Sequence, residues 1–307
     1  MKTLFLVNPK AGRGSALRVW QRIEPLVPRE RGVEVVIPDS LAATRKTASE
    51  AVKAGVERVV VVGGDGTLLS VADELVHSDT AVGLIPAGTG NDFRRDYGLP
   101  RRPEEALAVA LGRETQRVDV GQAWGGRHFL NAAGIGFDAE VAVKASTYPS
   151  GLGGTLPYLM GAITTLLQYR PMEVRVTVDG ERRYEGDSTM IAVANGRYYG
   201  GGMQIAPSAR RDDGLIDVCI AEGMGPLKLL GLLPQVYGGG HVRSPRVHVL
   251  RGEHVQIEVG APVRAHVDGD PLPYESLTFQ ARARALRVAM PGEGEARGLP
   301  RAGEARR

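Results

Sequence analysis

The residues best placed to do chemistry come directly after four consecutive valines. Val59–Val62 leads into the turn Gly63–Thr67, which reads Gly-Gly-Asp-Gly-Thr, and a helical apolar pattern follows the turn. A strand, a glycine-rich turn and a helix in this order direct backbone N–H groups and the helix dipole at a phosphate. The turn is not a Walker A loop, because no Gly-Lys-Ser/Thr follows it. Asp65 stands where that loop has its lysine, which indicates a carboxylate that steers a metal or other groups around the phosphates.

Two more turns have the same setting. Asn8–Gly14 follows a strand predicted at 3–7, and Pro86–Phe93 follows a strand predicted at 82–85. Ligands of open α/β sheets bind outside the carboxyl ends of the strands. Three such turns at one edge of one sheet therefore predict a nucleotide-binding site.

The elements that position these turns alternate along the first part of the chain. We expect strands at 3–7, 33–37, 58–62, 82–85 and 116–119, and helices at 15–26, 43–54, 67–76 and 103–111. Such alternation is typical of a parallel sheet with helices on its faces. Val59–Val62 lacks the alternation of a half-exposed strand, so both of its faces should be buried.

The chain changes character after Asp119. Short strands separated by Gly, Pro and Asp-Gly turns predict a β-rich, sandwich-like second domain that contains two apolar helices. Its strands are expected at 127–133, 172–179, 188–195, 214–221, 246–250, 254–259, 263–268 and 277–289, and its helices at 155–169 and 226–237. The predicted division is an α/β nucleotide-binding domain at 1–122, a β-rich domain at 123–290 and a disordered tail at 291–307.

Composition excludes several classes of protein. The net charge is only +3 and aromatic residues make up 5% of the chain, so we expect no nucleic-acid partner. The single cysteine, Cys219, excludes an internal disulfide and fits a reducing compartment. The N-terminal strand is too short for a signal peptide, and no apolar run approaches the ~18 residues of a membrane span. The sequence predicts a cytoplasmic protein that associates peripherally with membranes.

The three turns, in their order and spacing, resemble a known family. Asn8-Pro-x-Ala-Gly-x-Gly14, Gly63-Gly-Asp-Gly-Thr67 and Gly88-Thr-Gly-Asn-Asp-Phe93 resemble the diacylglycerol kinase catalytic domain, in particular the soluble bacterial lipid kinases. These are relatives of sphingosine kinases and, more distantly, of NAD kinases. Motifs of the second domain extend the resemblance to about residue 290: Asn131–Asp138, Asn195–Met203, Asp212–Asp217 and Val267–Asp270. The Gly-Gly-Asp-Gly-Thr turn alone would leave NAD kinase or phosphofructokinase open.

The resemblance implies that ATP and Mg²⁺ bind to the first domain. The residues that match the family's nucleotide-binding positions are Asn8, Pro9, Lys10, Ala11, Gly12, Gly64, Asp65, Gly66, Thr67, Thr89, Asn91, Asp92 and Asp119. Among these, the carboxylates of Asp65, Asp92 and Asp119 match an acidic network around the nucleotide's magnesium, an ion that prefers oxygen ligands. Structural explanations remain open: Asp65 also fits an Asx-turn, and a lone Asp at a strand end, such as Asp119, is often structural.

The resemblance also assigns a catalytic residue in the second domain. Asp268 matches the family's proposed general base, the carboxylate that orients the attacking hydroxyl and accepts its proton. The family motif here is Asp-Gly-Glu, whereas this chain has Asp-Gly-Asp, so Asp270 keeps the charge of the usual glutamate but is one methylene shorter. Asp-Gly between strands is also a common hairpin turn. Both interpretations can hold together.

A structural metal site is the least complete match. Asp213 and the backbone carbonyl of Leu215 match a structural magnesium site of bacterial relatives. Three residues before Asp213, where relatives can supply another ligand, this chain has Arg210, and a guanidinium cannot ligate a cation. The sequence leaves open whether a metal is absent or is held by carbonyls and water.

The function implied by the resemblance is ATP-dependent phosphorylation of diacylglycerol to phosphatidic acid. The same chemistry on a sphingoid base, phosphatidylglycerol or a polyprenol stays open, and a non-catalytic nucleotide- or lipid-binding regulator is the rival from another class. The expected partners are ATP and a lipid alcohol at the membrane surface, and the sequence allows a homodimer. The apolar stretches Leu152–Leu167 and Leu227–Val236 fit either an acyl-chain site or ordinary core helices.

Overall fold

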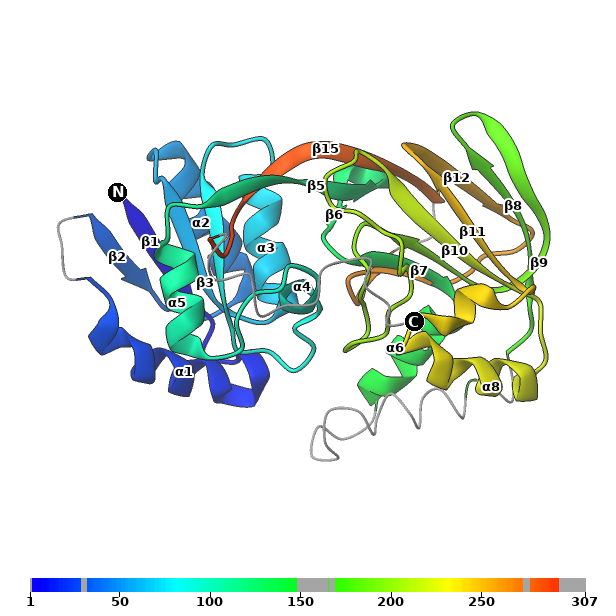
Figure 1. Cartoon of the computed structure of the whole chain (residues 1–307), viewed down its shortest axis with the longest axis horizontal. Helices are drawn as coiled ribbons and strands as arrows, with labels where there is room; N and C mark the ends of the chain where they lie inside the picture. Colours follow the sequence, from blue (N-terminus) through cyan, green and yellow to red (C-terminus); the bar gives the residue numbers. More distant parts are fainter. Residues whose placement is uncertain (1, 29–31, 148–164, 166–168, 273–276, 293–307) are drawn as a thin grey trace. The chain divides into compact units, whose positions relative to one another are not determined.

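The computed structural model describes residues 2–28, 32–147, 165, 169–272 and 277–292, which form two compact units (Figure 1). One unit runs to Arg117 and takes in the chain again from Leu286; the other spans Val118–Ala285. The chain passes between the units inside the strands β5 (Thr115–Ala123) and β15 (Leu277–Ala289). The end of β15 therefore belongs to the first unit, although the sequence assigned this segment to the second domain.

The first unit is built on a parallel sheet, as predicted. Its strand order is β2 (Val33–Val36), β1 (Thr3–Val7), β3 (Arg58–Gly63) and β4 (Ala81–Pro86), and the end of β15 pairs in parallel with β4. Every residue of β1, β3 and β4 is buried. Burial on both faces explains why the valine run shows no alternation.

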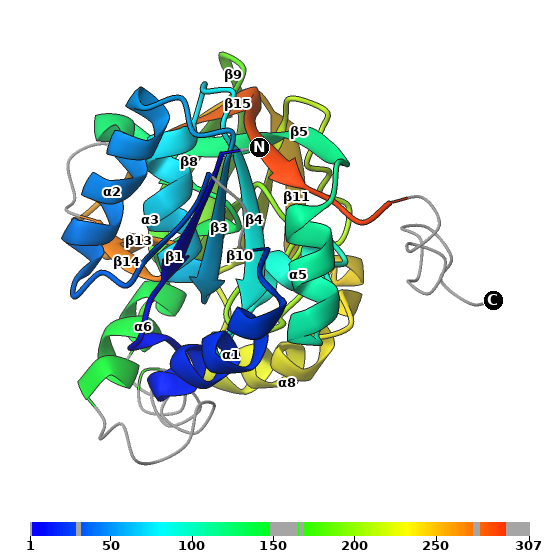
Figure 2. The ribbon, with the colours of Figure 1, turned by 90° about the vertical axis from the view of Figure 1, so that its left-hand side faces the viewer.

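Helices cover both faces of this sheet. They are α1 (Ser15–Ile23), α2 (Leu41–Lys53), α3 (Asp65–Leu75), α4 (Asp92–Asp96) and α5 (Pro103–Leu111). Trp20 of α1 and Leu107 of α5 share a core cluster with Val60 of β3. Figure 2 shows α2 and α3 on the other side of the sheet, where Arg45 of α2 pairs with the carboxylates of Asp73 and Glu74 of α3.

The second unit is rich in β-strands, and one long strand pairs along its two halves with different neighbours. The first half of β9 (Glu181–Ala194) pairs with β8 (Met172–Val178), and its second half pairs with β7 (Ala132–Gly136) and β10 (Ile216–Glu222). The remaining strands are β6 (His128–Phe129), β11 (Val247–Gly252), β12 (His254–Val259), β13 (Ala265–Val267), β14 (Asp270–Leu272) and β15. One apolar core cluster combines residues of β7, β9 and β10 with residues of β8, β12 and β15.

Two α-helices of the second unit are described, α6 (Phe137–Thr147) and α8 (Pro226–Val236). The helix expected at 226–237 is present as α8, whereas the helix expected at 155–169 and the apolar stretch at 152–167 lie almost entirely outside the described residues. The helices α4 and α6 and the strand β14 were not expected from the sequence. The segment predicted as one strand at 127–133 forms β6 and β7 instead. No helix among the described residues is long and apolar enough to cross a membrane.

Candidate active-site residues

The three turns that the sequence singled out lie together in the first unit. Asn8 donates a side-chain hydrogen bond from Nδ2 to Oγ1 of Thr67, with the two atoms 2.8 Å apart, and so joins the first turn to the second. Ser15, just after the first turn, donates from Oγ to the carbonyl oxygen of Ala87 at 2.7 Å and joins it to the third. Parallel strands bring their carboxyl ends to one edge, and these hydrogen bonds then fix the turns on one another.

Glycines allow the turns to approach closely. Gly64 and Gly88 pack backbone to backbone, because a Cβ on Gly88 would lie 2.5 Å from Cα of Gly64. Gly12 has a left-handed φ of +56°, and a Cβ there would collide with the carbonyl oxygen of Ala87. Side chains at these positions would force the turns apart, so the glycines are required by the packing of the backbone.

The second turn is shorter than the sequence suggested, because α3 already begins at Asp65. Its first intrahelical hydrogen bond joins the N–H of Leu68 to the carbonyl oxygen of Gly64 at 2.9 Å. The N–H groups of Asp65, Gly66 and Thr67 precede that bond and form the first turn of the helix. Such N-terminal N–H groups and the positive end of the helix dipole favour a phosphate.

Asp65 also holds the start of α4. Its Oδ2 accepts a hydrogen bond from the N–H of Asp92 and its Oδ1 accepts one from the N–H of Phe93, both at 3.1 Å. The sequence allowed an Asx-turn within its own loop, but the carboxylate caps the next loop instead. Asp92 is buried, with 4% of its surface exposed, and its Oδ1 lies 2.7 Å from Nη1 of Arg95.

The carboxylates of Asp65 and Asp92 fit a magnesium ion that is carried by a nucleotide. Oδ2 of each residue lies beside Gly90, 3.0 and 3.7 Å from the position that a Cβ on this glycine would take. Mg²⁺ in nucleotide sites is often held by one or two carboxylates together with water and phosphate oxygens. The described residues contain no group of three or more Asp, Glu, His or Cys side chains that could hold a metal without such a partner.

Asp119 is placed apart from this pair, in the second unit. It is fully buried, its Oδ2 accepts a hydrogen bond from the N–H of Gly214 and its Oδ1 accepts one from the N–H of Arg284, both at 2.7 Å. The carboxylate therefore links two backbone segments of that unit, as the structural explanation expects. Its assignment to the nucleotide stays a prediction.

The remaining predicted nucleotide residues divide into structural and exposed positions. Asn91 adopts a left-handed φ of +54° and closes its turn, since its Oδ1 accepts a hydrogen bond from the N–H of Gly88 and its Nδ2 donates one to the Gly88 carbonyl. Thr89 is exposed at the tip of this turn. Lys10 is also exposed, and its Nζ donates to the carbonyl oxygen of Asp39 at 3.1 Å. Pro9 and Ala11 are half-buried.

Asp268 occupies the turn of the hairpin that joins β13 to β14. Asp268 and Gly269 both have positive φ, +45° and +92°, which is the backbone of a two-residue type I′ turn. The Asp268 carboxylate accepts hydrogen bonds from the backbone N–H groups of Leu130 at 2.7 Å, Asn131 at 3.0 Å and Ala132 at 2.9 Å. These donors stabilise the charge and fix the direction of the carboxylate. Backbone donors have no side-chain signature, so the sequence could not identify them.

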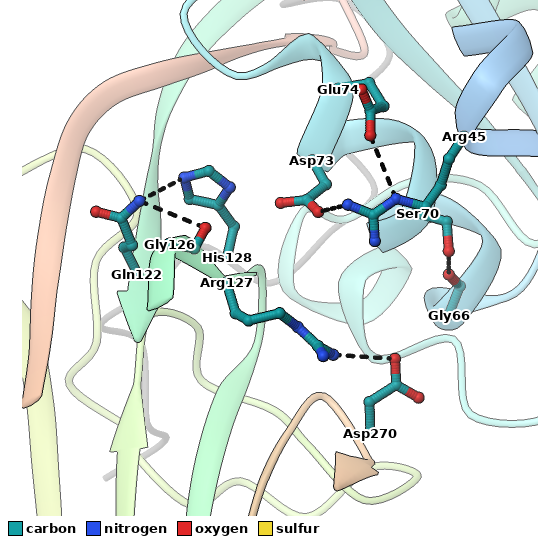
Figure 3. A network of polar contacts seen from close by, with 10 residues as sticks. All are labelled: Arg45, Gly66, Ser70, Asp73, Glu74, Gln122, Gly126, Arg127, His128 and Asp270. Atoms are coloured by element: carbon teal, nitrogen blue, oxygen red, sulfur yellow. Dashed lines mark hydrogen bonds and ion pairs between the residues drawn. The ribbon is translucent and has the colours of Figure 1, made fainter. Parts of the chain in front are cut away.

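Asp270 is exposed and interacts weakly. Figure 3 shows its carboxylate facing Arg127, whose Nη2 lies 3.6 Å from Oδ2, and 65% of the Asp270 side chain is exposed. An exposed pair at this distance contributes little to stability.

The segment predicted to hold a structural metal is neutralised by arginine. Arg251 forms an ion pair with Asp213, and its Nε lies 3.4 Å from Oδ2 of Asp217, a residue that is 1% exposed. Oδ1 of Asp213 accepts a hydrogen bond from the N–H of Leu215 at 3.2 Å. Arg210 lies 3.5 Å from Asp212. Guanidinium groups therefore lie against these carboxylates, and the assignment of a metal to Asp213 and the Leu215 carbonyl stays a prediction.

Comparisons with known proteins agree with this arrangement. The model of the diacylglycerol kinase catalytic domain matches residues 2–123, and that of the YegS C-terminal NAD kinase beta sandwich-like domain matches residues 131–290. A protein of Mycobacterium tuberculosis named diacylglycerol kinase is 32% identical over 305 residues, which cover 95% of this chain and 96% of the relative. A probable YegS-like lipid kinase of Pseudomonas aeruginosa is 32% identical over 292 residues and 94% of each chain.

Solved structures share the fold. A putative diacylglycerol kinase from Bacillus anthracis superposes with a TM-score of 0.81 at 24% identity and 96% coverage of both chains. An NAD kinase from Archaeoglobus fulgidus in complex with ATP gives a TM-score of 0.51 at 14% identity, with 97% of this chain and 96% of that chain covered. The α/β unit followed by a β-rich unit is therefore common to both kinds of kinase.

Proposed function

The chain belongs to the diacylglycerol kinase catalytic-domain family and is a lipid kinase, and from this premise we propose that it transfers the γ-phosphoryl group of ATP to the hydroxyl of diacylglycerol. The product is phosphatidic acid. The acceptor is proposed from the relative that is named diacylglycerol kinase; the relatives named probable lipid kinases support only the broader class.

The observation that carries the ATP site is the hydrogen-bonded convergence of the three glycine-rich turns. Their backbone N–H groups and the start of α3 suit a polyphosphate, and Thr89 is exposed beside them. Asp65 and Asp92 would hold the magnesium ion of the nucleotide, which neutralises phosphate charge when it is bound.

Asp268 is the proposed general base. In phosphoryl transfer the protein mainly positions groups, while a carboxylate orients the attacking hydroxyl and accepts its proton. The three N–H donors of 130–132 hold this carboxylate in one orientation. Asp270 supports the local negative charge from the surface of the hairpin.

The lipid is proposed to be taken up at a membrane surface, where a diacylglycerol headgroup lies. Helix α8 combines a buried face, as in a core helix, with an exposed apolar residue that could contact lipid. Leu229 is buried in a core cluster with Phe137 and Met224, whereas Leu230 is 45% exposed. Tyr237, at the end of the helix, is 54% exposed. An apolar surface of this kind favours contact with lipid.

A test uses labelled ATP and a panel of lipid alcohols in mixed micelles, with Asp268→Ala beside the wild type. We expect label in phosphatidic acid for the wild type and none for the variant. Label in a phosphorylated sphingoid base, phosphatidylglycerol or polyprenol, without phosphatidic acid, would replace the acceptor but keep the chemistry. No labelled lipid from any acceptor would refute the proposal and favour a regulator.

A further inference from the structure

A buried histidine and a carboxylate lie directly behind the hairpin that carries Asp268. His266 is on β13, opposite Gly134 of β7, and Asp138 is in the first turn of α6. Nε2 of His266 lies 3.3 Å from Oδ2 of Asp138, and the two side chains are only 8% and 10% exposed. This Oδ2 is buried, and the imidazole is its ion-pair partner rather than a hydrogen-bond partner of good geometry. A buried carboxylate oxygen needs such a partner, because removing its charge from water is costly.

The backbone leaves room for this pair. A Cβ on Gly134 would overlap Oδ2 of Asp138 and lie 2.5 Å from Nε2 of His266. The glycine therefore provides the space in which the imidazole and the carboxylate meet.

The other ring nitrogen of His266 reaches the hairpin itself. Nδ1 accepts a hydrogen bond from the N–H of Gly269, with the two atoms 3.2 Å apart. An accepting Nδ1 carries no proton, so the proton of the neutral ring is on Nε2 and faces Asp138. The contacts thus run from Asp138 through His266 to the residue next to Asp268.

We propose that His266 and Asp138 are positioning residues for phosphoryl transfer, which hold the Asp268-Gly269 turn in its left-handed conformation. The inference rests on the proposed role of Asp268. Positive φ has a steric cost for any residue with a Cβ, although Asp tolerates it better than most, so contacts around the turn add to the local preference of Asp-Gly. The bond from Gly269 to His266 is one such contact, and Asp138 fixes the ring that accepts it.

The arrangement makes the turn sensitive to pH. Burial lowers the pKa of His266, but the carboxylates of Asp138 on α6 and of Asp268 and Asp270 on the hairpin raise it more, so the net shift is above the ordinary value. Among the described residues, the other ionisable groups near Asp138 include Tyr169, Glu140 and Arg264, the last two paired at 3.0 Å. A protonated ring carries hydrogen on Nδ1 and cannot accept from Gly269. Positioning is therefore lost as the pH falls through the raised pKa.

Two variants of His266 separate its two contacts. The amide oxygen of His266→Asn can replace Nδ1 as the acceptor for Gly269, whereas the longer side chain of His266→Gln reaches toward Asp138 instead. We expect kcat to fall about 10- to 100-fold in His266→Gln and about threefold or less in His266→Asn, with an unchanged KM for ATP, because a small misplacement of a catalytic group is costly. Equal losses in the two variants, or a loss that appears only in the KM for ATP, would overturn the proposal.

Asp138→Asn tests the pH dependence. Without the carboxylate the pKa of His266 falls, so the acid limb of the kcat profile moves to lower pH. The matched control is Glu222→Gln, which breaks another histidine–carboxylate pair of the same unit, with Nε2 of His248 2.8 Å from Oε1, and should leave the profile in place. An acid limb that does not move in Asp138→Asn would contradict the proposal.

An NMR titration tests the inference without any kinase assay. In the wild-type protein the amide signal of Gly269 should titrate with the same midpoint as the imidazole of His266, and both midpoints should fall together in Asp138→Asn. A Gly269 signal that is indifferent to the His266 titration would refute the positioning role even if the enzyme is active. If no lipid is phosphorylated but the two signals titrate together, the proposed function fails and the structural coupling stands.

Discussion

At the scale of single residues, the acidic residues predicted to act at the site also accept hydrogen bonds from backbone N–H groups. Asp65 accepts from two N–H groups of α4, Asp119 from Gly214 and Arg284, and Asp268 from three residues of the second unit. The structural and catalytic explanations that the sequence left side by side are therefore compatible for Asp65 and Asp268. Variants must be designed to separate the two roles.

The structural and the proposed catalytic role of Asp268 can be separated by comparing two substitutions. Asp268→Asn keeps a side-chain oxygen as an acceptor, and Asp268→Ala leaves three backbone donors without one. We expect both to reduce kcat by about 10²–10⁴-fold, the usual contribution of a general base. Asp268→Ala should also lower the free energy of unfolding by about 1–3 kcal/mol, the cost of unsatisfied buried donors. Asp268→Asn should lower it by less, because its amide oxygen still accepts from Asn131 and Ala132 while its NH2 faces the N–H of Leu130. Kinetics and thermal unfolding check this, and a kcat close to that of the wild type in Asp268→Asn would contradict the assignment.

Arg251 stabilises the buried carboxylate of Asp217. The stability that is lost when Arg251 is replaced should therefore depend on pH. Burial raises the pKa of Asp217, against the effects of its hydrogen bond from Ser208 and of Arg251. Arg251→Ala should destabilise the protein by about 1–3 kcal/mol at pH 8, because it leaves that charge without its partner. A carboxyl with a raised pKa takes up a proton as the pH falls, and a neutral carboxyl no longer needs a cationic partner. The destabilisation caused by Arg251→Ala should therefore become smaller toward pH 5.

Unfolding of the Arg251→Ala variant and the wild type across this pH range measures the difference. Lys46→Ala is a suitable control, since Lys46 belongs to an exposed pair with Glu50 at 3.9 Å. A loss of stability in Arg251→Ala that is the same at pH 5 and pH 8 would show that Asp217 is not its cause.

At the scale of elements, the site depends on the close packing of turns that follow different strands. The turn after β1 is joined to the turns after β3 and β4 by the hydrogen bonds of Asn8 and Ser15, and Gly64 packs on Gly88. Close backbone contact leaves no room for a side chain, so the glycine content of these turns follows from their packing as well as from phosphate binding.

Gly88→Ala tests this packing. The new Cβ would lie 2.5 Å from Cα of Gly64, so the turns must separate and ATP binding should weaken by tenfold or more, which is about 1.4 kcal/mol. The control is Gly231→Ala in α8, where nothing lies within 4 Å of the added Cβ. Calorimetric titration of Mg·ATP into both variants compares them, and equal affinities would show that the contact of the two glycines is not needed for binding.

At the scale of the whole molecule, the two units carry different parts of the proposed chemistry. The nucleotide turns belong to the first unit, and Asp268 with its supporting groups belongs to the second. Asp65 and Asp92 in the first unit fit a cation that arrives with a nucleotide, whereas the carboxylates around Asp213 in the second are neutralised by arginine. Catalysis should therefore need a divalent cation that folding does not need.

Chelation of divalent cations with EDTA should affect catalysis but not folding. Kinase activity should disappear and return on addition of Mg²⁺, because the transferred phosphate needs its charge neutralised. The Tm of the nucleotide-free protein should not change, since Arg251 supplies the positive charge near Asp213 and Asp217. A marked fall of the Tm in EDTA would show that a structural cation is bound after all.

Elements with a strong local pattern were predicted well from the sequence. The helix expected at 103–111 and the strands expected at 254–259 and 277–289 have those bounds in the structure. Elements with a weak pattern were missed in whole or in part. The strand β7, Ala-Ala-Gly-Ile-Gly, was predicted only in part, as the end of a strand at 127–133, because it has little intrinsic strand preference and depends on its pairing with β9 and β13. The helix α4 is one short turn that begins after the left-handed Asn91 and is capped by a residue 27 positions earlier.

The sequence by itself determined the fold class, the kinase family and the side chains that could do the chemistry, because residue types and their spacing along the chain are local information. The tertiary structure decided which backbone groups meet these side chains. The N–H groups of Leu130–Ala132 reach Asp268 across 136 to 138 positions, and Gly269 reaches the ring of His266 that Asp138 holds. Every residue except proline has a backbone N–H, so only the pairing of strands can select the few donors that fix the carboxylate of Asp268.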